Sequence, residues 1–440
     1  MQFTTADLAA ATGGTATGAD VTVNGASIDS RTLDRGQLFV PIVAERDGHE
    51  FLPAALAAGA SAYLTSRDDT PPPDGAAAIR VDDTALALRA LGRAARARIG
   101  ERVVGVTGSV GKTSTKDLLA GVLASTYRTT ASAKSFNNEL GLPLTLVGAE
   151  DGTEAAVLEM GARGVGHIAT LCEIASPTVG VLTRVEAVHL ENFGSLEAVA
   201  QTKGELVESL PASGVAVLNA DDENVAAMAT RTAARVLTYS AAGASADLTA
   251  ADVVLDDELR ASFTLHSPWG SVPVHLGARG EHQVGNALAA AAAGGSLGVG
   301  LDGIVSGLRS AALSGLRMEF SQTDSGLTII NDAYNANPTS MTAALQALVR
   351  VDVPRRVAVL GTMAELGEDA ALAHREIAEL ASSLGVDVVA VDEPRYGDGV
   401  VHVGDAAAAA DYLASLDAPL AVLVKGSRVA ALERVVELLG

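Results

Sequence analysis

The chain has a single cysteine, Cys172, among 440 residues. One thiol excludes an internal disulfide framework and any zinc site built from several thiolates. The amino-terminal stretch lacks the basic residues and the leucine-rich run of a secretion signal. The alanine-rich stretches are broken by glycine or charge well before they reach the length of a membrane span. We therefore expect a cytoplasmic protein without a membrane-inserted segment.

Positive charge is also scarce. The 31 lysine and arginine residues face 53 aspartate and glutamate residues, which gives a net charge of -22. Such a chain does not bind nucleic acid or an anionic membrane non-specifically, so anionic ligands have to be met by local basic pockets. We expect small molecules as partners, no nucleic acid, and a monomer.

Lysine is scarcer still, at five of these 31 residues. Where arginine provides solubility, the remaining lysines are enriched at positions that need a compact charge or an amine that can be modified. Lys112 and Lys203 fit these two needs through the motifs described below. For Lys116, Lys134 and Lys425, an incidental surface location is an equally good interpretation.

The clearest motif is a glycine turn between an apolar strand and a helix, in the segment VGVTGSVGKTST at residues 104–115. Glycines let backbone N–H groups converge on an anion, and the helix N-terminus adds partial positive charge. In this loop type the lysine reaches the β- and γ-phosphates and the hydroxyl after it ligates Mg²⁺. Val106 stands where the full pattern has glycine, and the alternative is an ordinary turn. We predict that the phosphates of a nucleoside triphosphate contact Gly108, Ser109, Val110, Gly111, Lys112, Thr113 and Ser114.

The length of the chain is too great for one core and indicates several domains. Residues 1–100 contain short strands and helices and predict a small α/β domain. Residues 101–314 alternate apolar strands with helices, which predicts a parallel sheet that binds ligands at the carboxyl ends of its strands. Residues 315–440 predict a second, doubly wound α/β domain. The pattern breaks near residues 99–102 and 313–316, where we expect joints.

Three residues of the middle segment could complete a metal site. Glu159 ends a predicted strand, His189 follows another, and Lys203 lies on the next helix. Strand-end placement brings the first two near the phosphates, where they could coordinate Mg²⁺ alongside Thr113. Taken alone, each has a plainer interpretation, because a lone histidine is usually structural and a lone glutamate solvated.

A series of segments along the whole chain resembles the Mur ligases, in the order found in that family. The amino-terminal DSRTLDRGQLFVPI and ERDGHEF fit as well. The other segments are GVTGSVGKTSTKDLL, SFNNELGLPLTL, LEMGA, VHLENFGSLEAVAQTKGEL, LNADDENV, GEHQVGNALAAAAA, LSGLRME, NDAYNANPTSMTAAL, LGTMAELGEDAALAHREI and VKGSRVAALERVV.

Two of these segments, NDAYNANPTSM and LGTMAELGE, resemble the family members that join D-alanyl-D-alanine to UDP-N-acetylmuramoyl-tripeptide (UDP-MurNAc-tripeptide). The DNPR signature of the members that add the third amino acid is absent. The resemblance implies an ATP-dependent ligase of peptidoglycan synthesis that works through an acyl phosphate. It also implies three α/β domains: a UDP-sugar domain at 1–100, a P-loop ATPase domain at 101–314 and a C-terminal ligase domain at 315–440.

The resemblance further implies roles for single residues. It places two Mg²⁺ ions on Thr113, Glu159, His189 and Lys203, with Lys203 N-carboxylated, because a bare ammonium would repel a metal that a carbamate oxygen can bind. Arg184 departs from the family, whose members carry an asparagine there. Implied catalytic residues are Lys112, Asn138, His189 and Lys203, with Asn137 beside Asn138. Implied nucleotide contacts are Tyr239, His282, Asn286, Arg317 and Asp332. Implied substrate contacts are Ser30, Arg31, Asp47, His49, Asn335, Asn337 and Lys425.

Other classes of protein share part of this pattern. A P-loop hydrolase or motor would also contain the GKT sequence, but its matching strand should end in aspartate, whereas this one ends in Glu159. An enzyme similar to folylpolyglutamate synthase shares the P-loop and the carbamate lysine, but it begins near its P-loop and lacks the DSR segment. A non-enzymatic nucleotide-binding scaffold would not need clustered metal ligands.

Overall fold

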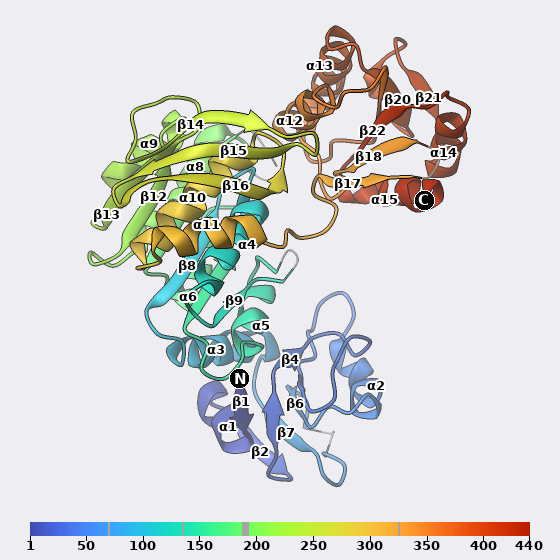
Figure 1. The fold of residues 1–440 in the computed structure, drawn as a ribbon. Helices are drawn as coiled ribbons and strands as arrows, with labels where there is room; N and C mark the ends of the chain where they lie inside the picture. The colour runs from blue at the N-terminus through green and yellow to red at the C-terminus, as the bar shows by residue number, and fades with distance from the viewer. Residues whose placement is uncertain (69–70, 134–135, 187–192, 324–325) are drawn as a thin grey trace.

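The computed structural model describes residues 1–440 except 69–70, 134–135, 187–192 and 324–325 (Figure 1). The larger sheets, of five, nine and six strands, follow one another along the chain. Helices pack against them, so the expected α/β architecture is confirmed. Within the described part of the chain, every helix is too short or too polar to span a lipid bilayer.

The first part of the chain forms a five-stranded sheet in the order β2-β7-β6-β5-β4, beside a small β1-β3 pair. Only β2 runs antiparallel to its neighbour in the five-stranded sheet. The elements are β1 (Gln2–Thr4), α1 (Thr5–Thr12), β2 (Thr15–Gly18), β3 (Thr22–Asn24), β4 (Ala26–Ser27), β5 (Leu38–Phe39), α2 (Leu52–Ala57), β6 (Ala62–Thr65), β7 (Ala77–Arg80) and α3 (Thr84–Ala97).

The nine-stranded sheet forms the middle of the molecule, in the order β16-β15-β14-β13-β12-β11-β8-β10-β9. Its elements are β8 (Arg102–Thr107), α4 (Lys112–Ala124), β9 (Thr129–Ala131), α5 (Gly141–Val147), β10 (Ala155–Glu159), α6 (His167–Ala175), β11 (Val179–Leu182), α8 (Leu196–Glu208), β12 (Val215–Asn219), α9 (Glu223–Ala226), β13 (Arg235–Ser240), β14 (Leu248–Leu255), β15 (Arg260–Ser267), β16 (Gly270–Arg279), α10 (Gln283–Ser296) and α11 (Leu301–Ser310).

This sheet is parallel from β9 to β14, as the alternation of strands and helices predicts, but β14, β15 and β16 pair antiparallel. Only Pro268 and Trp269 separate β15 from β16, and so short a connection cannot cross over to a parallel neighbour. Successive residues of β8 face opposite sides. Val103 enters a core covered by α5, α6 and α8, and Val104 enters one covered by α4, α10 and α11.

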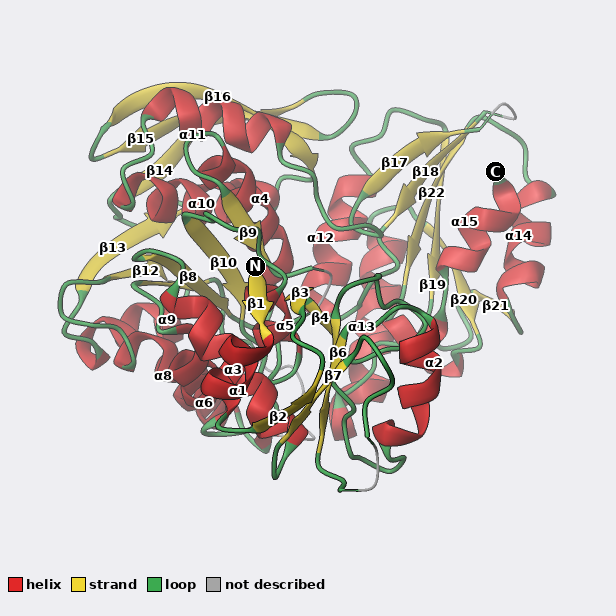
Figure 2. Cartoon of the chain, turned by 90° about the horizontal axis from the view of Figure 1, so that it is seen from below, coloured by secondary structure: helices red, strands yellow, loops and turns green. Residues whose placement is uncertain are grey.

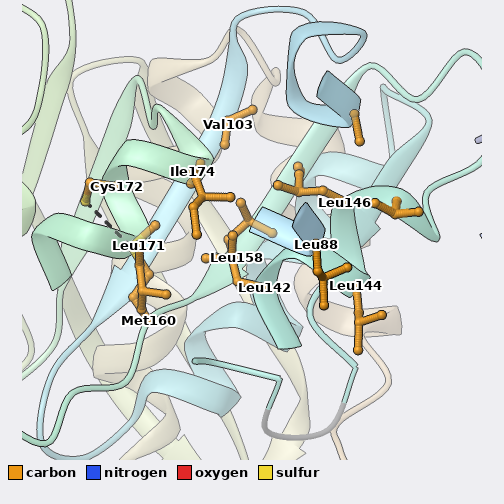
Figure 3. Close-up of a cluster of buried hydrophobic side chains, with 14 of the residues drawn as sticks. Leu88, Val103, Leu142, Leu144, Leu146, Leu158, Met160, Leu171, Cys172 and Ile174 are labelled. Atoms are coloured by element: carbon orange, nitrogen blue, oxygen red, sulfur yellow. Dashed lines mark hydrogen bonds between the residues drawn. The ribbon is translucent and has the colours of Figure 1, made fainter. Parts of the chain in front are cut away.

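The amino-terminal part is joined to the middle part by a shared core. Leu88 of α3 lies among Leu142 and Leu144 of α5, with Leu158 and Ile174 in the same cluster of buried side chains (Figure 3). Burial of this kind contributes roughly 1.5–3 kcal/mol per large apolar side chain. Helix α3 therefore holds the first sheet against the middle domain.

The six-stranded sheet at the C-terminal end has the order β17-β18-β22-β19-β20-β21 and is parallel except for β17. Figure 2 shows α12 and α13 on one face and α14 and α15 on the other, the expected doubly wound arrangement. The elements are β17 (Glu319–Gln322), β18 (Leu327–Asn331), α12 (Pro338–Leu348), β19 (Arg355–Leu360), α13 (Ala370–Ser383), β20 (Asp387–Val391), β21 (Val401–Val403), α14 (Ala406–Ala414), β22 (Leu420–Lys425) and α15 (Glu433–Leu439).

Candidate active site

The predicted phosphate loop connects β8 to α4. Gly108 has φ 147° and Gly111 has φ 88°, conformations that L side chains rarely adopt. A Cβ atom on Gly108 would lie 1.9 Å from the Thr183 hydroxyl oxygen, so the loop also approaches β11 too closely for any other residue. The Lys112 ammonium folds back over the loop and donates to the carbonyls of Gly108 at 2.8 Å and Ser109 at 3.2 Å. It therefore lies over the backbone that the sequence predicts to hold phosphate.

A carboxylate stands beside the start of α4. Glu159, the last residue of β10, is buried, and its Oε2 accepts a hydrogen bond from the Thr113 hydroxyl at 2.7 Å. Its Oε1 accepts one from the Asn137 side chain at 2.9 Å. Arg317, from the far side of the site, donates to the Thr113 hydroxyl at 3.0 Å and stacks on Tyr334 with 4.4 Å from Cζ to the ring centroid. The hydroxyl is thus shared by an anion and a cation from different parts of the chain.

The carboxyl ends of β18 and β22 supply a second cluster. Lys425, 2% exposed, donates to Asp332 Oδ2 at 2.5 Å and to the Asn335 carbonyl at 2.9 Å. Asn337 caps α12 through the Ser340 amide at 2.9 Å. Lys425, for which the sequence allows either a surface location or a place in the site, is therefore buried at the edge of the C-terminal sheet.

A cavity of about 740 Å³ joins the two clusters. It is lined by both the central and the C-terminal domains, which is where ligands of parallel sheets bind. Among the residues that the sequence singles out, it brings together Ser109, Val110, Gly111, Lys112, Thr113, Ser114, Asn137, Glu159, Arg184, Tyr239, His282, Asn286, Arg317, Asp332, Asn335, Asn337 and Lys425.

Helix α10 forms another wall of this cavity. Asn286 accepts a hydrogen bond from the Thr115 hydroxyl at 3.2 Å and so ties α10 to α4. His282 immediately precedes α10, and desolvation lowers the pKa of its imidazole, against the opposing charge of Asp332. A neutral imidazole can donate one hydrogen bond and accept another.

Lys203 lies outside this lining, on α8. Its side chain is 4% exposed, and no hydrogen bond or ion pair links its amine to another residue that the structure describes. Burial lowers its pKa far below the ordinary value for lysine, and the charge of Lys112 lowers it further. His189, predicted beside it, lies outside the described residues. Among those that are described, no three His, Cys, Asp or Glu side chains are grouped as metal ligands.

The two neighbouring asparagines differ in what they contact. Asn137 lines the cavity and holds Glu159, whereas the Asn138 side chain accepts hydrogen bonds from the amides of Leu140 at 3.2 Å and Gly141 at 2.8 Å. Asn138 thus satisfies free amides at the start of α5. The cavity lining includes Asn137 and not Asn138, and the predicted catalytic role of Asn138 stays a prediction.

The predicted sugar-nucleotide residues lie apart from this cavity, in the amino-terminal domain. His49 is buried, its Nδ1 is 2.6 Å from Asp47 Oδ1, and its Nε2 accepts the Ser66 amide at 3.1 Å. Hydrogen bonds from His49 hold the pKa of Asp47 far below its usual range. The Arg31 side chain is 86% exposed and forms an ion pair with Asp29 at 2.7 Å. Ser30, which lies between these two residues in the sequence, is half-buried. His49 and Asp47 therefore bind each other.

Sequence reasoning missed Thr183 and Tyr334. The Thr183 hydroxyl donates to the Val110 carbonyl at 2.6 Å and fixes the loop from β11, and Tyr334 supports Arg317. The buried Tyr239 hydroxyl bonds the Leu182 carbonyl at 3.2 Å. Arg184, the departure from the family, is half-exposed and lies 3.7 Å from Glu186. Thr183 directly follows a strand of the parallel sheet, and this position is the signal by which the sequence could have identified it.

Known protein families match most of the chain. Residues 106–294 match the Mur ligase middle domain, and residues 316–428 match the Mur ligase glutamate ligase domain. UDP-N-acetylmuramoyl-tripeptide--D-alanyl-D-alanine ligase of Mycobacterium tuberculosis H37Rv is 44% identical over 394 residues, covering 82% of this chain and 76% of that protein. The Escherichia coli K12 protein of the same name is 38% identical, covering 96% and 95%. This chain belongs to the Mur ligase family.

Solved structures of this Mur ligase type have the same fold. MurF from Acinetobacter baumannii superimposes with a TM-score of 0.89 at 30% identity, covering 100% of this chain and 99% of that one. The MurF ligase from Thermotoga maritima, solved in complex with ADP, gives 0.82 at 30% identity, covering 95% and 97%. The resemblance and the fold class predicted from the sequence are both confirmed.

Proposed function

We propose that this Mur ligase joins D-alanyl-D-alanine to UDP-MurNAc-tripeptide, converting ATP to ADP and phosphate and forming UDP-MurNAc-pentapeptide. The observation that carries the proposal is the cavity between the phosphate loop and the C-terminal sheet edge. It offers Lys112 and Thr113 on one wall and Asp332 and Lys425 on the other. ATP and a second substrate can therefore meet in one cavity. Relatives of 38–44% identity carry the name of this activity.

The reaction needs a leaving group, because a carboxylate does not accept an amine at neutral pH. The terminal carboxylate oxygen of the tripeptide attacks the γ-phosphorus of ATP, the bond from that phosphorus to the β-γ bridging oxygen breaks, and ADP departs. Lys112 and the loop amides are placed to balance charge on the phosphate oxygens, an effect worth several kcal/mol in phosphoryl transfer.

The amine of D-alanyl-D-alanine then attacks the carbonyl carbon of the acyl phosphate. The C–N bond forms, the C–O bond to phosphate breaks, and inorganic phosphate leaves with the electron pair. The amine proton passes to water or to a base that the side chains of the cavity do not single out. Asn138 and its neighbour Asn137 are proposed to orient the acyl phosphate, which is supported by the position of Asn137 in the cavity beside Glu159.

The residues present fit Mg²⁺. Thr113 and Glu159 offer a hydroxyl and a buried carboxylate oxygen 2.7 Å apart, and oxygen donors are those Mg²⁺ prefers. We propose two ions, held by Thr113, Glu159, His189 and Lys203. When bound, they supply positive charge against the phosphate oxygens.

Lys203 is proposed to be N-carboxylated. Its neutral amine would attack the carbon of CO2, so that a C–N bond forms while one C=O π bond opens and its electron pair moves to oxygen. The nitrogen then gives a proton to water, which leaves a carbamate anion. Burial at 4% exposure favours an uncharged amine over an ammonium, and the pattern VHLENFGSLEAVAQTKGEL carries the family resemblance at this position. The carbamate would turn a buried lysine into an oxygen donor.

The three parts of the chain are proposed to divide the binding. Residues 1–100 bind the UDP-sugar end through Ser30, Arg31, Asp47 and His49. Residues 101–314 bind ATP. Residues 315–440 bind the dipeptide and close on the nucleotide, with contacts from Asn335, Asn337 and Lys425 to substrate and from Arg317 and Asp332 to ATP.

The test is ADP release measured with UDP-MurNAc-tripeptide, with and without D-alanyl-D-alanine, and with the pentapeptide product identified by mass. The expected result is ADP release that requires both substrates and matches the product mole for mole. ADP release without peptide product would favour a P-loop hydrolase. Tripeptides that carry lysine or diaminopimelate at the third position, compared side by side, establish the preferred substrate.

A further inference from the structure

The segment that joins the central domain to the C-terminal domain, residues 311–318, is called the linker here. It leaves α11 at Ser310 and enters β17 at Glu319 (Figure 1). Three of its residues contact α4, the helix that begins at the phosphate loop. The contacts join Arg317 to Thr113 at 3.0 Å and the Ser314 amide to Asp117 Oδ2 at 2.7 Å, and a Cβ atom on Gly121 would lie 3.0 Å from that of Ala311.

The spacing of these contacts is regular. Positions 113, 117 and 121 are four residues apart, so they lie one above another on one face of α4. Positions 311, 314 and 317 are three apart in a segment outside regular helix. The linker therefore runs along the P-loop helix toward its N-terminus, tied at three successive turns.

Other residues of the linker are tied to the C-terminal domain. The Leu316 carbonyl accepts the Tyr334 amide at 3.2 Å, and the Met318 amide donates to Asp332 Oδ1 at 3.2 Å. Leu316 and Met318 have φ 61° and 51°, a backbone region that costs energy for residues other than glycine. Such conformations persist when surrounding contacts hold them, here from both domains.

The middle contact to α4 contains a buried ion pair. Lys116 is 3% exposed, its Nζ lies 2.5 Å from Asp117 Oδ1, and it also donates to the Ser132 carbonyl at 2.8 Å. The Ser132 hydroxyl in turn accepts the amide of Glu159 at 3.1 Å. Asp117 thus keeps one oxygen for Lys116 and one for the linker. No step of the proposed reaction uses either residue.

We propose that Asp117, oriented by Lys116, is a positioning residue that sets the register of the linker on α4 and so places the Arg317 guanidinium at the Thr113 hydroxyl. A carboxylate that accepts a backbone amide makes a strong, directional hydrogen bond. Without the bond from the Ser314 amide to Asp117, the linker keeps its two outer contacts, but Arg317 samples more conformations. Binding of a nucleotide then costs more conformational entropy. The inference rests on the proposed ATP-dependent function.

The test is the affinity for the magnesium complex of AMP-PNP, measured by calorimetry on the full chain. Asp117→Ala should weaken binding about tenfold, the effect of one lost charge-assisted hydrogen bond. Ser314→Pro removes the amide donor without changing Asp117 or Lys116, so it should give a similar loss and decides the matter if Asp117→Ala does not fold. Asp302→Ala, which removes an exposed aspartate from the first turn of α11 outside the linker, is the control and should leave the affinity unchanged.

A double-mutant cycle separates positioning from general loosening. In an Arg317→Ala background, Asp117→Ala should change affinity by less than about twofold, because its effect passes through Arg317. The same tenfold loss in both backgrounds, or wild-type affinity in both Asp117→Ala and Ser314→Pro, would overturn the inference while leaving the proposed function standing. A wild-type chain that binds no AMP-PNP would overturn the function itself.

Discussion

The cavity between the central and C-terminal domains and the predicted sugar site of the amino-terminal domain use charge in different ways. In the cavity, Lys112 contacts backbone carbonyls and Arg317 contacts a hydroxyl, so these two positive side chains point to neutral partners, whereas Lys425 is paired with Asp332. In the amino-terminal domain, Arg31 is paired with Asp29, and Asp47 holds both His49 and Arg67. A charge on a neutral partner retains most of its attraction for a ligand, whereas a paired charge does not.

The contrast separates two kinds of mutational effect. Removing Lys112, whose partners are backbone carbonyls, should reduce turnover and leave stability nearly unchanged. Removal of a buried, mutually bonded residue of the amino-terminal domain should reduce stability first. The following predictions test that separation, from the largest effect to the smallest.

Lys112→Ala should reduce the rate of ligation about 100-fold or more, because a charge aimed at transferring phosphate is worth ~3 kcal/mol. The fold should survive, since the side chain donates only to the Gly108 and Ser109 carbonyls. ADP release with both substrates measures the rate, and thermal unfolding checks the fold. Arg163→Ala, which removes an exposed cation from the loop after β10, is the control. More than a tenth of the wild-type rate would contradict the phosphate-loop assignment.

Lys203→Ala should be inactive and should recover part of its rate with formate or acetate, which can supply the lost carboxylate oxygen. Lys203→Arg should also be inactive, because a guanidinium does not form the carbamate. The spectroscopic check is a carbamate signal from ¹³C-bicarbonate in the wild type that is absent in Lys203→Met. Normal turnover of Lys203→Arg would rule out N-carboxylation.

Much of the fold and part of the site can be predicted from sequence, because local rules suffice for them. The glycines of the phosphate loop, the apolar strand before it and Lys112 after it are neighbours in the chain, and the structure keeps them together. The alternation of strands and helices predicts crossover connections and hence parallel strands throughout. The antiparallel pairing of β15 and β16 departs from that prediction because a two-residue turn connects them.

Other features required the tertiary structure. Asn137 and Asn138 are identical in type and adjacent, and only the packing of α5 against β10 determines which side chain reaches Glu159. For Lys116 and Lys425 the sequence leaves a surface location and a site equally open, and the structure buries both with a carboxylate partner. The scarcity of lysine singles out each of these residues in the sequence. Burial of a charged side chain costs free energy unless a partner offsets it, and in the sequence that partner is distant or ambiguous.

His49→Ala should lower the free energy of unfolding by about 2 kcal/mol, since it leaves the Ser66 amide and the Asp47 carboxylate without their partner. Turnover at saturating substrate should stay within about threefold of the wild type, because His49 does not line the cavity. Urea unfolding measures the stability. His402→Ala, which removes an exposed histidine bonded to the Gly397 carbonyl, should change it far less. Equal losses in both variants would refute a special role for the His49 pair.

Arg31→Ala should have the smallest effect on stability, because an exposed ion pair contributes about 0–1 kcal/mol. Its side chain is 86% exposed, so removal leaves no buried group unsatisfied. If Arg31 binds the sugar nucleotide as the family resemblance predicts, KM for UDP-MurNAc-tripeptide should rise about tenfold with kcat unchanged, the pattern of a contact made equally in ground and transition states. Arg35→Ala, an exposed arginine of the same domain, should leave KM unchanged. An unchanged KM in Arg31→Ala would mean that Arg31 serves only its ion pair with Asp29. Every charged residue predicted at the sugar site of the amino-terminal domain would then be occupied by its own partner, unlike Lys112 and Arg317 in the cavity.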